Sequence, residues 1–134
     1  MTGRVLALDY GSARCGCALS DPTGTIATPL TVVERPATRR GFARVLALVD
    51  EHDVGTILVG LPLSLSGGDS AQTAETREFA ERLRRRLGER VAVELVDERF
   101  TTVLAERDPG RAAPDARAAA HLLSGWLAGG RSGG

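Results

Sequence analysis

The sequence contains no lysine, so all 17 basic residues are arginine, and they balance 17 acidic residues. A formal net charge of zero does not mark the chain as a nucleic-acid-binding protein, although the distribution of charge matters more than its sum. Arginine binds phosphate through two parallel hydrogen bonds. The absence of net positive charge therefore leaves nucleic-acid binding open.

Cysteine and histidine are equally scarce, with two of each. Cys15 and Cys17 lie two positions apart on one expected strand, where the geometry disfavours a disulfide bridge. We interpret them as small core residues rather than as a redox or metal pair. A zinc site would need further ligands, and His52 and His121 have no evident acid, metal or nucleophile partner in the sequence.

Long apolar runs are absent, and none approaches the roughly 18–20 residues that span a bilayer. The first apolar run, Val5 to Leu8, is too short for a signal peptide and ends in Asp9. We therefore expect a cytoplasmic protein without a membrane partner. The length favours one domain, residues 1–128, followed by a disordered glycine-rich tail, residues 129–134.

The order of local patterns predicts an α/β fold. Three short runs rich in apolar or β-branched residues come first, at Val5 to Leu8, Cys15 to Leu19 and Leu30 to Glu34. Their short connections predict an antiparallel meander. The later strands, Thr56 to Val59 and Val91 to Val96, are separated by helices, which implies parallel crossovers. We expect a five-stranded mixed sheet with helices on its faces.

Local signals also delimit the helices. The first helix carries an amphipathic stripe at Phe42, Val45, Leu46 and Val49, and Thr38 is a suitable N-cap. Asp69 and Gln72 resemble a capping box before the second helix, and Gly88 suits the end of that helix. Pro114 suits the first turn of the last helix.

Carboxylates stand at the ends of elements. Asp9 closes the first strand, Asp97 and Glu98 close the last strand, and Asp115 opens the last helix. If the two strands are parallel, their carboxyl ends share the edge where open α/β sheets place their sites. Converging carboxylates repel one another unless a divalent cation such as Mg²⁺ or Mn²⁺ neutralises them. Two such ions could assist phosphodiester cleavage.

Each of these residues also has a structural explanation. Asp115 complements the dipole of the helix that it begins. Asp97 to Arg99 could form a surface turn with a salt bridge. The arginines between Arg82 and Arg86 are equally consistent with a solvated helix face. From the residues alone, a metal-assisted nuclease is one reading among several.

Four motifs in order give the chain a specific resemblance. It resembles the YqgF (RuvX) family of candidate pre-16S ribosomal RNA nucleases, also called Holliday-junction-resolvase-like proteins. The resemblance covers about residues 3 to 128. It rests on Leu8-Asp9-Tyr10-Gly11 with Arg14 and Gly16, Val59-Gly60-Leu61-Pro62, Asp97-Glu98-Arg99-Phe100-Thr101-Thr102, and Asp115 with its alanine-rich helix.

The resemblance implies a ribonuclease H-like fold and a metal-dependent nuclease. It implies Asp9, Glu98 and Asp115 as catalytic, metal-binding carboxylates, with Asp97 as the alternative to Glu98. The cofactor would be Mg²⁺ or Mn²⁺, and the substrate would be structured RNA at the 5′ end of precursor 16S ribosomal RNA. Phosphate contacts are expected from the following residues: Arg14, Arg85, Arg99, Thr101 and Thr102.

Two alternatives stay open. A resolvase of Holliday-junction or other branched DNA would need a dimer to cut two strands symmetrically, and the sequence shows no sign of one. A non-catalytic module that binds nucleic acid or the maturing ribosome would not bind metal. In contrast to the usual family pattern, the segment from Val103 to Pro114 carries only Arg107 and Arg111 as cations. This favours the binding module, and it predicts weak binding in which the shape of the nucleic acid determines the choice of substrate. We expect a monomer or weak dimer.

Overall fold

The computed structural model describes residues 3–62, 70–97 and 114–130 of the chain. The expected order of strands and helices is confirmed. The elements are β1 (Arg4–Asp9), β2 (Arg14–Ser20), β3 (Ala27–Glu34), α1 (Arg39–Glu51), β4 (Val54–Leu61), α2 (Ala71–Leu87), the 3₁₀ turn η1 (Gly88–Arg90), β5 (Ala92–Asp97), α3 (Pro114–Gly125) and the π-type turn η3 (Trp126–Gly130). Of the expected tail, residues 131–134 lie outside the described part.

The five strands form one mixed sheet in the order β3-β2-β1-β4-β5. The β1–β2 and β2–β3 pairs are antiparallel, whereas β1–β4 and β4–β5 are parallel. β1 and β5 are therefore parallel to each other, as expected, but only β1 is central, whereas β5 lies at one edge of the described sheet and β3 at the other. This topology brings the carboxyl ends of β1, β4 and β5 to the same edge of the sheet.

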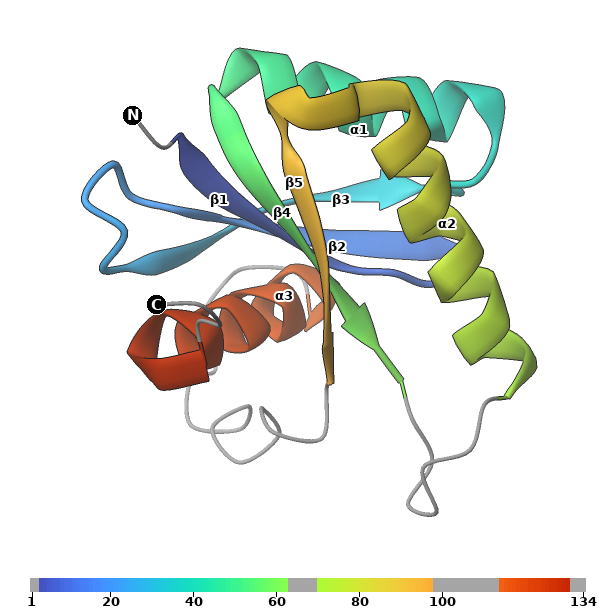
Figure 1. Cartoon of the computed structure of the whole chain (residues 1–134). Helices are drawn as coiled ribbons and strands as arrows, with labels where there is room; N and C mark the ends of the chain where they lie inside the picture. Colours follow the sequence, from blue (N-terminus) through green and yellow to red (C-terminus); the bar gives the residue numbers. More distant parts are fainter. Residues whose placement is uncertain (1–2, 63–69, 98–113, 131–134) are drawn as a thin grey trace.

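Helices cover both faces of the sheet, with α1 and α2 on one side and α3 on the other (Figure 1). The strands alternate accordingly. Leu6 and Leu8 of β1 pack in the larger core beneath α1 and α2. Val5 and Ala7 pack in a smaller core beneath α3. Each face of the sheet therefore has its own hydrophobic core. Because side chains alternate along a strand, the position of a residue in that alternation determines the face to which it belongs.

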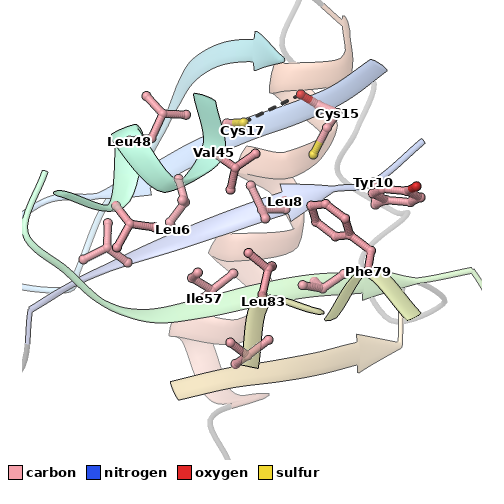
Figure 2. Close-up of a cluster of buried hydrophobic side chains, with 14 of the residues drawn as sticks. Leu6, Leu8, Tyr10, Cys15, Cys17, Val45, Leu48, Ile57, Phe79 and Leu83 are labelled. Carbon is pink, nitrogen blue, oxygen red and sulfur yellow. Dashed lines mark hydrogen bonds between the residues drawn. The ribbon is translucent and has the colours of Figure 1, made fainter. Parts of the chain in front are cut away.

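Aromatic residues join β1 to the helices in the larger core (Figure 2). The ring of Tyr10 lies 4.5 Å from that of Phe79, and its hydroxyl donates to Oε2 of Glu75 at 2.6 Å. Burial, with help from the Glu75 carboxylate, raises the pKa of Tyr10 well above its usual value of 10. Cys15 and Cys17 are free and buried in the same core, so their expected position as small core residues is confirmed.

The helix ends follow the local signals with one exception. Thr38 caps α1 by accepting a hydrogen bond from the Gly41 amide, and Gly88 ends α2 with a φ of 63°. The predicted capping box of Asp69 and Gln72 is wrong, because the N-cap of α2 is Ser70, whose side chain accepts from the Thr73 amide. Thr73 in turn donates its hydroxyl to the Pro62 carbonyl, so a contact distant in sequence fixes this helix start.

Arg84 differs from the arginines that follow it on α2. Its Nε and Nη2 both donate to the Val93 carbonyl of β5, at 3.2 and 2.8 Å. Arg84 therefore connects α2 to β5 instead of belonging to a free basic face. Among the described helices, none is long and apolar enough to cross a membrane.

Candidate active site

Asp9 ends the central strand on the face that α3 covers. Side chains alternate along a strand, and Asp9 has the parity of Val5 and Ala7, which pack in the core beneath α3. Its partner in the antiparallel register is Gly16 of β2. The carboxylate is partly exposed at the strand end, so it avoids the large cost of full burial.

Gly16 is the point at which the first turn of α3 meets the sheet. A Cβ atom built on Gly16 would lie 1.8 Å from the carbonyl oxygen of Asp115 and 2.2 Å from its carbonyl carbon. Only glycine allows this close approach of backbone to backbone. Because Gly16 is also the register partner of Asp9, the packing brings Asp9 and Asp115 to neighbouring positions on the same face.

The thiol of Cys15, the residue before Gly16, is affected by the charge of both carboxylates. Its pKa is raised well above the ordinary value, first by a hydrogen bond with Cys17 and by burial. The negative charges of Asp9 and Asp115 raise the pKa further. Both carboxylates therefore lie within electrostatic range of one atom at the start of β2.

Arg14 supplies a cation beside this pair. Its Nε donates to Oδ2 of Asp115 at 3.1 Å, and both side chains are substantially exposed, at 59% and 41%. An exposed pair of this kind contributes about 0–1 kcal/mol to stability. The contact is therefore better suited to positioning the Asp115 carboxylate than to holding the fold together.

Asp97 lies on the other face of the sheet by strand parity. It is the last residue of β5 and comes two positions after Leu95, so both side chains have the same parity. Leu95 packs against the core beneath α1 and α2, whereas Val96 packs against the core beneath α3. The parity of Asp97 is therefore opposite to that of Asp9. The other candidate at this strand end, Glu98, lies outside the described residues.

The remaining expected site residues divide into two groups. Arg99, Thr101 and Thr102 lie outside the described part of the chain, as does Glu98. Arg85 is described, and it lies on α2, on the opposite side of the sheet from α3 (Figure 1). It therefore does not join Asp9 and Asp115.

The chemistry of the donors fits a hard divalent cation. Asp9 and Asp115 offer carboxylate oxygens, the ligands that Mg²⁺ and Mn²⁺ prefer. Within the described ranges, no group of three His, Cys, Asp or Glu side chains could hold a metal ion. The two carboxylates beside Gly16 have the chemistry of part of such a ligand set, and a further carboxylate would be needed to complete it.

Gly16 is the positioning residue whose role the sequence did not reveal. It is part of the family resemblance, but its physical role is to admit the Asp115 backbone. The available signal was a glycine inside an otherwise apolar strand, which often marks close backbone approach. That signal does not say which distant segment approaches.

Comparison with known proteins identifies relatives of the whole chain. The RuvX family, described as Holliday junction resolvase, matches residues 3–129. A protein named "Putative pre-16S rRNA nuclease" from Anaeromyxobacter sp. (strain Fw109-5) is 44% identical, covering 94% of this chain and 97% of its own length. A protein of the same name from Maridesulfovibrio salexigens is 37% identical, covering 93% and 98%.

Solved structures share the fold at low sequence identity. RuvC of T. thermophilus, in complex with a Holliday junction substrate, superimposes with a TM-score of 0.64 at 17% identity, covering 96% of this chain and 97% of that one. The yeast mitochondrial Holliday junction resolvase Ydc2 gives a TM-score of 0.57 at 12% identity, covering 94% and 78%. The expected ribonuclease H-like fold is confirmed.

Proposed function

The chain belongs to the RuvX family, and from this premise we propose that it hydrolyses phosphodiester bonds at the 5′ end of precursor 16S ribosomal RNA. Nuclease activity follows from the family, and the RNA substrate is taken from the names of the relatives. The observation that carries the proposal is the packing of Asp115 against Gly16, beside Asp9. Action on precursor ribosomal RNA would place the protein in the cytoplasm.

Three carboxylates would hold the metal: Asp9, Asp115 and Glu98. We assign Glu98 rather than Asp97 because Asp97 has the parity of the opposite sheet face. Bound Mg²⁺ or Mn²⁺ would activate a water molecule and stabilise the leaving oxygen of the phosphodiester. The chain's own contribution is to fix the carboxylates on rigid elements, a strand end and a helix start, so that little reorganisation is needed.

Cations of the chain would position the RNA. Arg14 lies on the same strand face as Gly16, and its guanidinium already contacts the Asp115 carboxylate. In the complex it would turn its remaining N–H groups towards the phosphate next to the scissile bond. Arg99, Thr101 and Thr102 would contact neighbouring phosphates. Such contacts position a substrate without reading its sequence.

Replacing Arg14 by alanine separates these roles. The melting temperature should change little, because the pair with Asp115 is exposed and contributes less than about 1 kcal/mol. Affinity for Mn²⁺, measured calorimetrically, should hold or rise, because a cation that competes for Asp115 is removed. The KM for RNA should rise. Arg44→Ala is a matched control, since it removes an exposed pair with Glu51 at 3.7 Å. If Arg14→Ala lowers the melting temperature markedly and Arg44→Ala does not, the pair of Arg14 with Asp115 stabilises the fold instead of positioning the carboxylate.

Cleavage of a defined precursor tests the substrate. Purified protein with Mg²⁺ or Mn²⁺ should shorten the 5′ end of precursor 16S ribosomal RNA, within ribosomal particles or as free RNA, and EDTA should stop the reaction. Mapping of the new 5′ end distinguishes specific cleavage from degradation. If the RNA stays intact under all of these conditions, the proposed substrate is wrong.

The family description favours one second candidate, a resolvase of Holliday junctions. A synthetic four-way DNA junction, tested beside the RNA, should be cut at symmetrical positions if that candidate is correct. Symmetrical cutting needs two active sites, so the mass of the protein–junction complex should then correspond to a dimer. Absence of metal binding, together with absence of cleavage of either nucleic acid, would indicate a binding module.

A further inference from the structure

A groove lined by arginines runs between α1 and α2, on the opposite side of the sheet from Asp115. Its volume is about 540 Å³. Arg39 of α1 and three residues of α2, Arg82, Arg85 and Arg86, line it, together with Phe42 and Leu46. Four cations thus surround a partly apolar floor, in a chain whose formal net charge is zero.

These arginines are largely available to a ligand. Among the described residues, none that lines the groove is acidic. Of the side chains that the structure describes, the ion-pair partner of Arg85 is Glu78 at 3.5 Å, in an exposed and therefore weak pair. Within the described part of the chain, Arg39 and Arg86 form no ion pair. The groove therefore combines positive charge with donors that its own surroundings leave unused.

Arg82 anchors the groove in a fixed geometry. Its guanidinium carbon lies 3.9 Å above the centre of the Phe42 ring, and its Nη1 donates to the Ala37 carbonyl at 2.7 Å. A guanidinium held over an aromatic ring and by a hydrogen bond costs little further ordering when it binds a ligand, and a guanidinium can itself stack on a base. Arg82 thus makes part of the groove pre-organised.

A line of aromatic contacts connects the groove to the strand that carries Asp9. Phe42 packs edge-on against Phe79, with ring centres 5.9 Å apart. Phe79 in turn packs on Tyr10 at 4.5 Å, as Figure 2 shows. Tyr10 directly follows Asp9 in the chain. Since well-packed interiors deform little, the groove keeps a constant position relative to the end of β1. A polymer held in the groove would therefore be held in a defined relation to the carboxylates.

We propose that this groove binds the sugar–phosphate backbone of a single-stranded RNA segment that flanks the cleavage site. The inference rests on the proposed function and adds a second contact region, on the other face of the sheet. Arginines bind the phosphates bidentately, while the apolar floor accommodates ribose and base surfaces. Two separated contact regions would make substrate choice depend on RNA shape, because the RNA must reach from the groove to the carboxylates.

Charge reversal in the groove tests the proposal in the absence of cleavage. The triple variant Arg39→Glu, Arg85→Glu, Arg86→Glu is made in the full chain together with Asp9→Asn. Binding of a fluorescent RNA hairpin with a single-stranded tail is measured in EDTA. We expect at least about a tenfold loss of affinity at low salt, and a fall of about 2 in the slope of log affinity against log salt, from roughly 0.7 per lost phosphate contact.

A matched control has the same charge change elsewhere. Arg40→Glu, Arg44→Glu and Arg90→Glu alter three exposed arginines that do not line the groove. If both triple variants weaken binding equally, only total charge matters and the groove is not a site. If the groove variant instead changes the mass of the free protein and leaves RNA affinity unaltered, the groove is an interface between two copies, and the proposal is overturned.

Two further comparisons keep the outcomes distinct. Should the glutamate variant lose its cooperative melting transition, the alanine version of the same triple variant is measured and judged by the same criteria. If the protein binds RNA through the groove but does not cleave it, the proposed function is overturned, whereas the proposal that the groove binds RNA is supported. Cleavage of the same RNA with groove-independent binding would overturn the groove alone.

Discussion

Replacing Asp9 by asparagine should reduce cleavage of precursor ribosomal RNA by at least about a hundredfold, which corresponds to roughly 2.7 kcal/mol of transition-state stabilisation. Asparagine keeps the shape of the side chain but removes one ligand charge from the face that Asp115 shares. Without metal, the melting temperature should hold or rise, because one of two neighbouring negative charges is removed. Single-turnover cleavage with Mg²⁺ or Mn²⁺, together with thermal melting in EDTA, measures both effects.

Asp50→Asn is the matched control for this experiment. Asp50 is an exposed carboxylate in the last turn of α1, and its amide variant should cleave normally. Trace contamination by host nucleases is the main hazard, so the two variants are purified in parallel. Undiminished cleavage by a clean Asp9→Asn preparation would remove Asp9 from the reaction.

Gly16→Ala should have the second large effect, through packing rather than charge. The new methyl group would lie 1.8 Å from the Asp115 carbonyl oxygen, so the first turn of α3 must move away from β2. Overpacking of this kind costs about 1–3 kcal/mol. A displacement of about 1 Å in a catalytic group can cost a hundredfold in rate. We therefore expect a lower melting temperature together with at least about a hundredfold loss of cleavage.

Two comparisons isolate the cause. Gly129→Ala adds a methyl group that meets no atom of the described residues within 4 Å apart from its chain neighbours, and should change neither property. Asp115→Asn leaves the packing at Gly16 intact, so it should lose cleavage without loss of stability. If Gly16→Ala melts lower but cleaves normally, the position of the first turn of α3 does not matter for the reaction, and Asp115 is not a ligand.

Local signals were sufficient for most of the fold. The apolar run from Val5 to Leu8 ends in a turn, and the stripe that begins at Phe42 follows a suitable cap at Thr38, so both elements were predictable from a few neighbouring residues. The parallel crossovers followed from the lengths of the connections. The family resemblance added the ribonuclease H-like topology, which the structural neighbours confirm.

Features decided by distant contacts were not predictable. Asp69 and Ser70 are both good cap residues, and the structure uses Ser70, next to a Thr73 that reaches the Pro62 carbonyl. Arg84 and Arg85 are neighbours on a basic helix, yet Arg84 faces β5 whereas Arg85 lines the groove.

The candidate site shows the same division. The positions of Asp9 and Asp115 at a strand end and a helix start indicated a shared edge. The sequence could not indicate that Asp115 would pack on Gly16, because that contact joins residues about a hundred positions apart. The choice between Asp97 and Glu98 needed one further fact, namely which side chains of β5 point to which face of the sheet. The role of Glu98 itself stays a prediction.

The hydrogen bonds from Arg84 to the Val93 carbonyl also affect the tendency of this protein to aggregate. In the described sheet, β5 has a paired neighbour, β4, on one side only. An outer strand with free carbonyl and amide groups is a template onto which a strand of another molecule can add, which leads to aggregation. A guanidinium that occupies the carbonyl of Val93, the second residue of β5, removes an acceptor and places a charge beside this strand. Arg84 would thus hinder the addition of a strand from another molecule to the edge of the sheet. This role is separate from any contact with nucleic acid.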